Sequence, residues 1–234
     1  MGRYLNAVID LLQRVAEANE EAVRAGAGIL ADVIARQGLV HVFGSGHSQL
    51  LALEIQARAG GLVPVQVIYD PTFGKAETVE GYAVSLLRDY ELSRGEAMIV
   101  ISNSGRNPAP IEIAIAARER GLSVIALTAL EFSRSVSSRH SSGKRLFELA
   151  DVVLDTMGGP GDALVRVEGL DVPVGPSSTV VGGALINELM VVTTEELVRR
   201  GFEPPVLRSQ NLDGSEVHNQ RVMAAYWGRI RRVI

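Results

Sequence analysis

Two short segments of glycine and small hydroxylated residues have the composition of an anion-binding site. Residues 42–48 read Val-Phe-Gly-Ser-Gly-His-Ser, and residues 101–107 read Ile-Ser-Asn-Ser-Gly-Arg-Asn. Each segment follows an apolar run and precedes a helix-like run. The first turn of a helix offers unpaired N–H groups and a positive dipole end, Gly admits a ligand close to the backbone, and Ser adds a donor. We therefore predict that loop 1 (residues 44–48) and loop 2 (residues 102–107) form two halves of one phosphate site.

The positions of the two loops strengthen this interpretation. In an open parallel sheet, ligands bind outside the carboxyl ends of the strands, where neighbouring strands send their connections to opposite faces. A single Gly-x-Gly such as residues 44–46 is more often only a tight turn. Because loop 2 repeats the Ser and Gly chemistry at an equivalent position, we favour a shared site.

The segments around the loops predict alternating strands and helices. Five short apolar runs have the pattern of strands that are covered on both faces. Strands that alternate with helices favour right-handed parallel crossovers. The predicted strands are residues 39–43, 63–69, 98–102, 122–128 and 152–155, and the predicted helices are residues 49–59, 77–87, 108–120 and 145–149. We expect an α/β fold, a three-layer α/β/α sandwich with a five-stranded parallel sheet of flavodoxin-like topology.

Further segments flank this core. Apolar residues three and four apart over 4–37 predict one or two amphipathic helices. A hairpin through 164–167 and 171–174 precedes a long helix, which is capped within 177–179 and runs to about Arg200. The expected parts are an N-terminal helical lead-in (1–37), an α/β domain (38–200) and a C-terminal tail with a last helix over 215–231 (201–234), in one structural domain overall.

Composition narrows the function classes. The chain has 234 residues, of which 47% are hydrophobic and 21% charged, so it can bury one sizeable core. A formal net charge of −4 argues against a protein that tracks the phosphates of nucleic acid. The chain has no cysteine, which excludes disulfides and thiolate ligands. No apolar run approaches the roughly 18 residues of a membrane span, and the amphipathic N-terminus does not resemble a signal peptide. We expect a cytoplasmic protein without nucleic-acid or membrane partners.

Nucleotide cofactors fit the two loops poorly. A dinucleotide-binding turn needs Gly-x-Gly-x-x-Gly, but Gln49 stands where the third Gly would be. The second strand ends without an acidic residue before Tyr69, although Asp70 follows it. A P-loop needs Gly-Lys-Ser/Thr after four spacer residues, and neither loop has this. No histidine pair has the spacing of metal ligands. We therefore predict no cofactor and no metal.

With these motifs the chain resembles the sugar isomerase (SIS) domain family over roughly residues 39–200. The family's first loop is similar to residues 44–48, and its second loop is similar to residues 102–107, although it usually ends in Thr or Ser rather than Asn107. The resemblance implies a homodimer or homotetramer that binds a phosphorylated sugar or amino sugar. It implies that the following residues hold the phosphate or line its pocket: Gly46, Ser48, Ser102, Ser104, Asn107 and Thr128.

Two branches of the family suggest different reactions. Phosphoheptose isomerases carry Ile-Gln-Glu on the long helix, and residues 186–188 read Ile-Asn-Glu, so Glu188 is our candidate base for the proton transfer of an aldose–ketose isomerisation. The histidines that follow this Glu in that branch are replaced here by Met190 and Glu195. N-acetylmuramate 6-phosphate etherases share Pro-Thr-aromatic-Gly, which matches residues 71–74, but Ile68 occupies the position of their acidic residue. The resemblance therefore favours isomerisation over an etherase or lyase reaction.

The sequence identifies the general acid of this reaction less clearly than the base. A histidine of near-neutral pKa suits the role. His41 alternates with apolar residues in a predicted strand and fits a hydrogen-bonded core residue, whereas His140 either reaches the pocket or caps a short helix. We favour His47, which lies in loop 1, and His218, which lies on the last helix. Glu188 lies among apolar neighbours on its helix, where an unpaired carboxylate would be costly to bury.

The sequence thus supports two hypotheses. In the first, the protein is an enzyme that isomerises a sugar phosphate or amino-sugar phosphate, with Glu188 as base and His47 or His218 as acid. In the second, it is a phosphosugar sensor without turnover that acts through a protein partner, because the phosphate site has stronger support than the catalytic residues.

Overall fold

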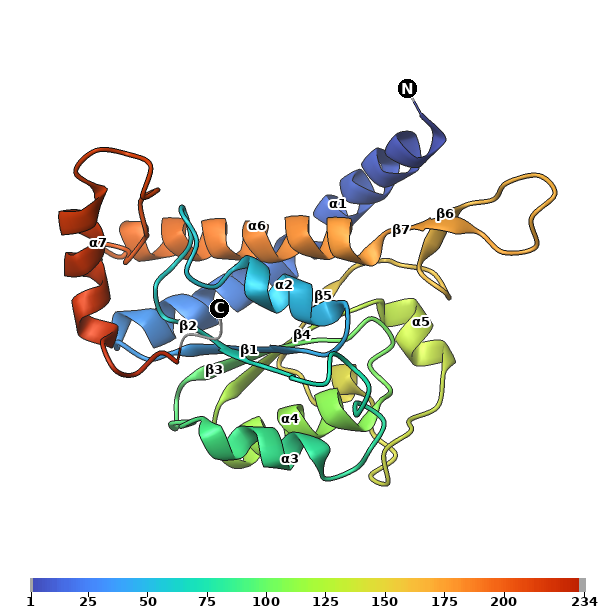
Figure 1. The fold of residues 1–234 in the computed structure, drawn as a ribbon, viewed down its shortest axis with the longest axis horizontal. Coiled ribbons are helices and arrows are strands. Elements are labelled where there is room, and N and C mark those ends of the chain that lie inside the picture. Colours follow the sequence, from blue (N-terminus) through green and yellow to red (C-terminus); the bar gives the residue numbers. More distant parts are fainter. Residues whose placement is uncertain (1, 232–234) are drawn as a thin grey trace.

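A five-stranded parallel sheet forms the centre of the molecule (Figure 1). The computed structural model describes residues 2–231, so Met1 and the end of the predicted tail, residues 232–234, lie outside the described residues. The strands are β1 (Val40–Gly44), β2 (Val65–Ile68), β3 (Ala97–Ile101), β4 (Ser123–Thr128) and β5 (Val152–Asp155). Their order is β2-β1-β3-β4-β5, and every pair is parallel. The predicted α/β fold and flavodoxin-like strand order are confirmed.

Helices cover both faces of the sheet and complete the three layers (Figure 1). One face buries side chains such as Val42 and Ile99 against α1 (Arg3–Ala35), α2 (Ser48–Glu54) and α6 (Ser178–Arg199). The other face buries Phe43 and Val100 against α3 (Tyr82–Leu86) and α4 (Pro108–Glu119). Alternate residues of one strand therefore enter different cores, as the pleat requires.

The N-terminal lead-in is one continuous helix. α1 runs for 33 residues, and its buried residues share a core with α6 and with the sheet. At the start of α4, Pro108 occupies the first helical position, where a missing N–H costs no hydrogen bond, and Gly121 follows the last turn with φ of 77°. The helix predicted over 108–120 is confirmed.

Several predicted helices are shorter than expected. The segment over 77–87 is helical only from Tyr82, because Gly81 adopts φ of 84° and prevents a helix from continuing through it. The helix predicted over 49–59 ends at Glu54, and the one over 145–149 is a single 3₁₀ turn, Leu146–Glu148. An additional helix that the sequence analysis did not predict, α5 (Leu130–Ser135), follows β4.

The long helix α6 takes its N-terminal cap from outside itself. We expected a Ser or Thr of residues 177–179 to cap it, but no side chain of the cap position bonds the helix. The carboxylate of Asp162 instead accepts the backbone N–H groups of Ser177 (3.0 Å) and Ser178 (2.7 Å). Asp162 precedes the hairpin of β6 (Ala163–Val165) and β7 (Val174–Pro176), so the hairpin and the start of α6 are tied together.

The C-terminal tail wraps the amino ends of β1 and β2. Residue Val206 forms an antiparallel bridge with Leu62, and α7 (Ser215–Met223) then packs on Leu39 and Val63. The predicted last helix is shorter than expected, since a 3₁₀ turn at Ala224–Tyr226 replaces its final turns. No helix within residues 2–231 is long and apolar enough to cross a membrane.

Candidate functional site

The two loops leave the sheet side by side. Gly44 and Ile101 pair as the last rung between β1 and β3, so loops 1 and 2 begin from adjacent positions. The helices that follow them diverge, because α2 covers the face of the sheet that α1 and α6 share, and α4 covers the opposite face. This is the crevice where open parallel sheets bind ligands.

Loop 1 is compressed against the start of α2. A Cβ atom at Gly44 would lie 2.4 Å from the carbonyl oxygen of Ser48 and 2.9 Å from the backbone nitrogen of Gln49. Gly46 has φ of 58°, and a Cβ at Gly74 would lie 3.0 Å from the Cα of Gly46. Glycine is therefore required by close backbone approaches, which bring the Pro71–Gly74 turn onto loop 1.

Asp70 fastens this turn to loop 1. It is fully buried, and its carboxylate accepts hydrogen bonds from the hydroxyls of Ser45 (2.6 Å), Thr72 (2.7 Å) and Tyr82 (2.5 Å), and from the N–H groups of Thr72 and Gly74 (both 2.9 Å). Burial alone would raise the pKa of Asp70, but these hydrogen bonds outweigh it and hold the pKa below its ordinary value. Asp70 is therefore an ionised positioning residue.

Loop 2 is supported from beneath by β4. Thr128 is fully buried, and its hydroxyl donates to the carbonyl oxygen of Asn103 (3.1 Å). The hydroxyl of Ser102 accepts the N–H of Gly105 (3.2 Å), which has φ of 59°. Thr128 thus holds the loop in shape, while Ser102 and Ser104 are only half-buried.

A small pocket opens between the loops and the start of α6. Ser48 and His47 line it from loop 1, and Asn103 lines it from loop 2. The sequence analysis missed three further polar residues of the lining: Thr156, Ser178 and Thr179. The enclosed space is only about 10 Å³, which suits a single water, so a larger ligand must extend outward from it.

Two oxygen atoms at this pocket have no hydrogen-bond partner among residues 2–231. They are Oδ1 of Asn103 and Oγ1 of Thr156, and both are buried. Buried polar atoms are nearly always satisfied, so an unpaired pair at a pocket marks a place where a ligand hydroxyl or water completes the bonding. Thr156 directly follows β5, and the only sequence signal for it was this position at a strand's carboxyl end.

Asn107, the residue that departs from the family pattern, joins two charged side chains. Its amide donates to Glu77 (2.6 Å) and its Oδ1 accepts from Arg139 (3.1 Å). Burial raises the pKa of Glu77, and the nearby charge of Asp70 adds to this, while Asn107 and Arg139 offset only part of the effect. A carboxyl group with a raised pKa therefore lies beside loop 2.

We expect Glu77→Gln to raise the midpoint of thermal unfolding at pH 7 by about 2–4 °C. Since the folded pKa of Glu77 is raised, its stabilising contribution is complete below the ordinary value of 4.5 and is lost as the pH rises through the folded pKa. Glutamine mimics the protonated acid, so its advantage should shrink towards pH 4. Calorimetry at both pH values, with exposed Glu17→Gln as control, measures this; a lower midpoint at pH 7 would contradict it.

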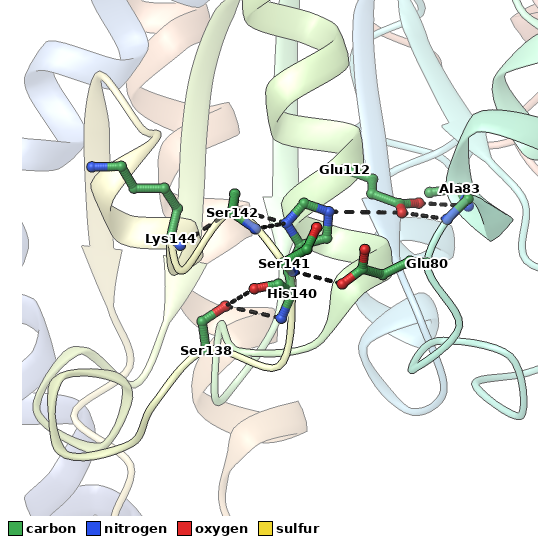
Figure 2. Close-up of polar contacts among 9 residues, drawn as sticks. Glu80, Ala83, Glu112, Ser138, His140, Ser141, Ser142 and Lys144 are labelled. Atoms are coloured by element: carbon green, nitrogen blue, oxygen red, sulfur yellow. Dashed lines mark hydrogen bonds and ion pairs between the residues drawn. The ribbon is translucent and has the colours of Figure 1, made fainter.

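His140 belongs to a polar cluster over the first turns of α3 and α4 (Figure 2). Its Nδ1 lies 2.8 Å from Oγ of Ser142, and its Nε2 faces the carboxylate of Glu112 at 3.8 Å. Glu112 accepts the N–H groups of Gly81 and Ala83, so it caps α3. His140 thus neither lines the pocket nor caps the 3₁₀ turn at 146–148, but links its loop to two helices.

Two of the three predicted catalytic residues lie apart from the pocket within one chain. Glu188 is exposed on α6, roughly 14 Å along the helix from Thr179. His218 lies on α7 at the amino ends of the strands, where its Nε2 contacts the carbonyl oxygen of Val206 (2.9 Å). Of the three, the structure brings only His47 to the loops, where it packs edge-on against Phe73.

His41 is a core residue, as its pattern predicted. It is buried, and its Nε2 lies 2.8 Å from a carboxylate oxygen of Glu96, which also accepts the N–H groups of Leu39 and Ser93. This pair lies at the amino ends of β1 and β3, away from the loops. Within residues 2–231, no three carboxylate or imidazole side chains gather in a way that could hold a metal ion.

The amino-acid sequence is similar to those of known proteins. Residues 3–129 match the SIS domain family. A UPF0309 protein of Halalkalibacterium halodurans is 37% identical over 236 residues, which cover 97% of this chain and 94% of the relative.

Solved structures share the fold at low sequence identity. Phosphoheptose isomerase from Neisseria gonorrhoeae superimposes with a TM-score of 0.56 and 18% identity over 82% of this chain and 95% of that one. The Vibrio vulnificus NanR protein complexed with ManNAc-6P has a TM-score of 0.53 and 18% identity over 95% of this chain and 67% of that one.

Proposed function

This chain belongs to the SIS domain family, and we propose that it binds a phosphorylated sugar or amino sugar between loops 1 and 2. The observation that carries the proposal is the pairing of Gly44 with Ile101, which starts both glycine- and serine-containing loops at one crevice. The hydroxyl groups of Ser48, Ser102 and Ser104 suit a phosphate. One protein of similar fold is a phosphoheptose isomerase, and another, NanR, has been solved in complex with ManNAc-6P.

The sugar ring would extend outward from the phosphate. Two unpaired acceptor atoms, Oδ1 of Asn103 and Oγ1 of Thr156, stand ready for sugar hydroxyls. Gly46 lets loop 1 turn with φ of 58°, and Thr128 acts from beneath by holding loop 2. In this arrangement Asn107 hydrogen-bonds both Glu77 and Arg139. It stands at the N-cap of α4, so it holds the end of loop 2 where the phosphate would bind.

We infer that the reaction is an aldose–ketose isomerisation. Such a reaction moves a proton between adjacent carbons and needs a carboxylate base and an acid. Glu188 remains our candidate base, with His47 or His218 as acid, but Glu188 and His218 lie too far from the pocket to serve it within one chain. They can take part only where a second copy of the chain brings them to it.

A homodimer or homotetramer is therefore part of the proposal. The outer face of α6 exposes Val180, Val191 and Val198 in one stripe, and the exposed Glu188 lies less than a quarter turn around the helix from it. Exposed apolar stripes of this kind are typical of subunit contacts. The cytoplasmic location expected from the sequence stays a prediction.

The ligand and the turnover can be tested separately. We expect a hexose, heptose or N-acetylhexosamine phosphate to raise the thermal midpoint, and the unphosphorylated sugar to have no effect. Ser104→Ala should weaken binding about tenfold, as expected for the loss of a hydrogen bond to a charged group.

Turnover is measured by NMR, which reports whether the sugar phosphate is converted. Loss of turnover in Glu188→Gln with binding retained supports Glu188 as the base, and unchanged turnover excludes Glu188 from this role.

The second candidate is a sensor that binds without turnover. The positions of Glu188 and His218, both away from the pocket within one chain, favour it. Stabilisation of the protein by a sugar phosphate without any converted product, even at high protein concentration, would support the sensor and exclude isomerisation of that sugar.

A further inference from the structure

A second, larger cleft lies at the opposite end of the molecule from loops 1 and 2. Its volume is about 920 Å³, within the range of small-molecule sites. The walls come from the loop that follows α2, the start of β2, the tail after Val206, and α7 with the segment that follows it. It shares no lining residue with the pocket between the loops.

The walls of this cleft are held in place by hydrogen bonds. The tail is paired with the segment before β2, where Val63 N–H donates to Pro205 (2.8 Å). The side chain of Asn219 clasps the backbone of Arg208 through two hydrogen bonds of 2.8 and 2.9 Å. Gln66 does the same for the backbone of Arg231 at the far wall. A ligand would therefore meet a cleft that is already formed.

The cleft is positively charged although the chain is not. Arg58 and Arg208 line it, and no Asp or Glu is among its described lining residues, while the chain has a net charge of −4. Arg58 also forms an ion pair with Glu54, the last residue of α2, but Arg208 has no ion-pair partner within residues 2–231. Charge therefore favours an anion near Arg208.

Aromatic and amide groups complete the lining. Trp227, the only Trp of the chain, lines the cleft and is 79% exposed, beside the buried ring of Tyr226. Gln56 is buried in the wall, and its Oε1 has no hydrogen-bond partner among residues 2–231. Exposed aromatic rings stack on planar ligands, and unpaired amides bond to polar ring edges.

From this combination we propose that the cleft binds a small organic anion with a planar aromatic ring, of about the size of a mononucleotide. Arg208, with Arg58, would hold the anionic group, Trp227 would stack on the ring, and Gln56 would pair with a polar atom of the ligand. The proposal is independent of loops 1 and 2.

Trp227 itself reports on occupancy, because it is the chain's single Trp. We expect AMP or UMP to quench Trp227 emission, excited at 295 nm to avoid the nucleobase absorption, with a saturable curve. Adenosine lacks the anion and ribose 5-phosphate lacks the ring, so each should bind about tenfold or more weakly. Benzoate tests the alternative source of an aromatic anion; saturable quenching by benzoate and not by nucleotides would assign the cleft to aromatic carboxylates.

Arg208→Gln should weaken the binding of the quenching ligand about tenfold, whereas Arg24→Gln, which changes an exposed arginine of α1, should leave it unchanged. Neither change should alter stabilisation by sugar phosphates, which depends on the other end of the sheet. Two results would overturn the proposal: no saturable quenching by millimolar AMP, UMP or benzoate, or equal affinity in wild-type protein and Arg208→Gln.

Discussion

Replacing Gly44 by alanine is expected to abolish sugar-phosphate binding and to destabilise the protein by about 3 kcal/mol or more. The added Cβ would lie 2.4 Å from the carbonyl oxygen of Ser48 and 2.5 Å from its carbonyl carbon. These are backbone atoms, so no side chain can rotate away to relieve the clash. The start of α2 must shift, and with it the N–H groups of loop 1.

A matched change tests whether position rather than composition matters. Gly159→Ala adds the same methyl group in the loop after β5, where nothing lies within 4 Å of the new atom and φ is not positive. We expect it to keep the stability and sugar-phosphate binding of the wild type. Urea unfolding and the ligand-induced thermal shift measure both properties, and wild-type binding by Gly44→Ala would contradict our description of loop 1.

The sheet could be predicted because its strands satisfy purely local rules. Each strand is a short and mostly apolar run, and helices between strands impose parallel crossovers. The same reasoning located α4, since Pro108 and Gly121 mark its ends. It was less successful for the short helix α3. The start of this helix depends on Gly81 and on the carboxylate of Glu112, which lies 31 residues after Gly81 in the sequence.

The site was only partly predictable for the same reason. Loops 1 and 2 carry recognisable residues and lie at strand ends, so their proximity follows from topology. Thr156 and Thr179 carry no motif and reach the pocket only because β5 and α6 fold beside it. The pairing of Asn107 with Glu77 and Arg139 joins residues that are far apart in the sequence, so no spacing rule could reveal it. The exposed position of Glu188 likewise depends on how α6 packs.

Replacement of Asp70 should disturb more elements of the site than replacement of any other residue discussed above. It accepts hydrogen bonds from Ser45 of loop 1, from Tyr82 of α3 and from Thr72 of the Pro71–Gly74 turn. Its own N–H donates to Gln49 of α2 (2.6 Å). Asp70→Ala leaves buried donors without an acceptor, and we expect it to cost about 3–5 kcal/mol of unfolding free energy. Urea unfolding at pH 7, with exposed Asp10→Ala as control, measures this cost.

The pH dependence separates the charge of Asp70 from its shape. Because hydrogen bonds lower its folded pKa, the stability it contributes is present above the ordinary value of 3.8 and is lost as the pH falls through the folded pKa. The difference between wild type and Asp70→Ala should therefore narrow in acid. Asp70→Asn keeps the shape but points an amide donor at other donors, so it should lose most of the same stability at pH 7. If Asp70→Asn matches the wild type there, the charge is dispensable and loop 1 is held by packing of Gly46 against Gly74 instead.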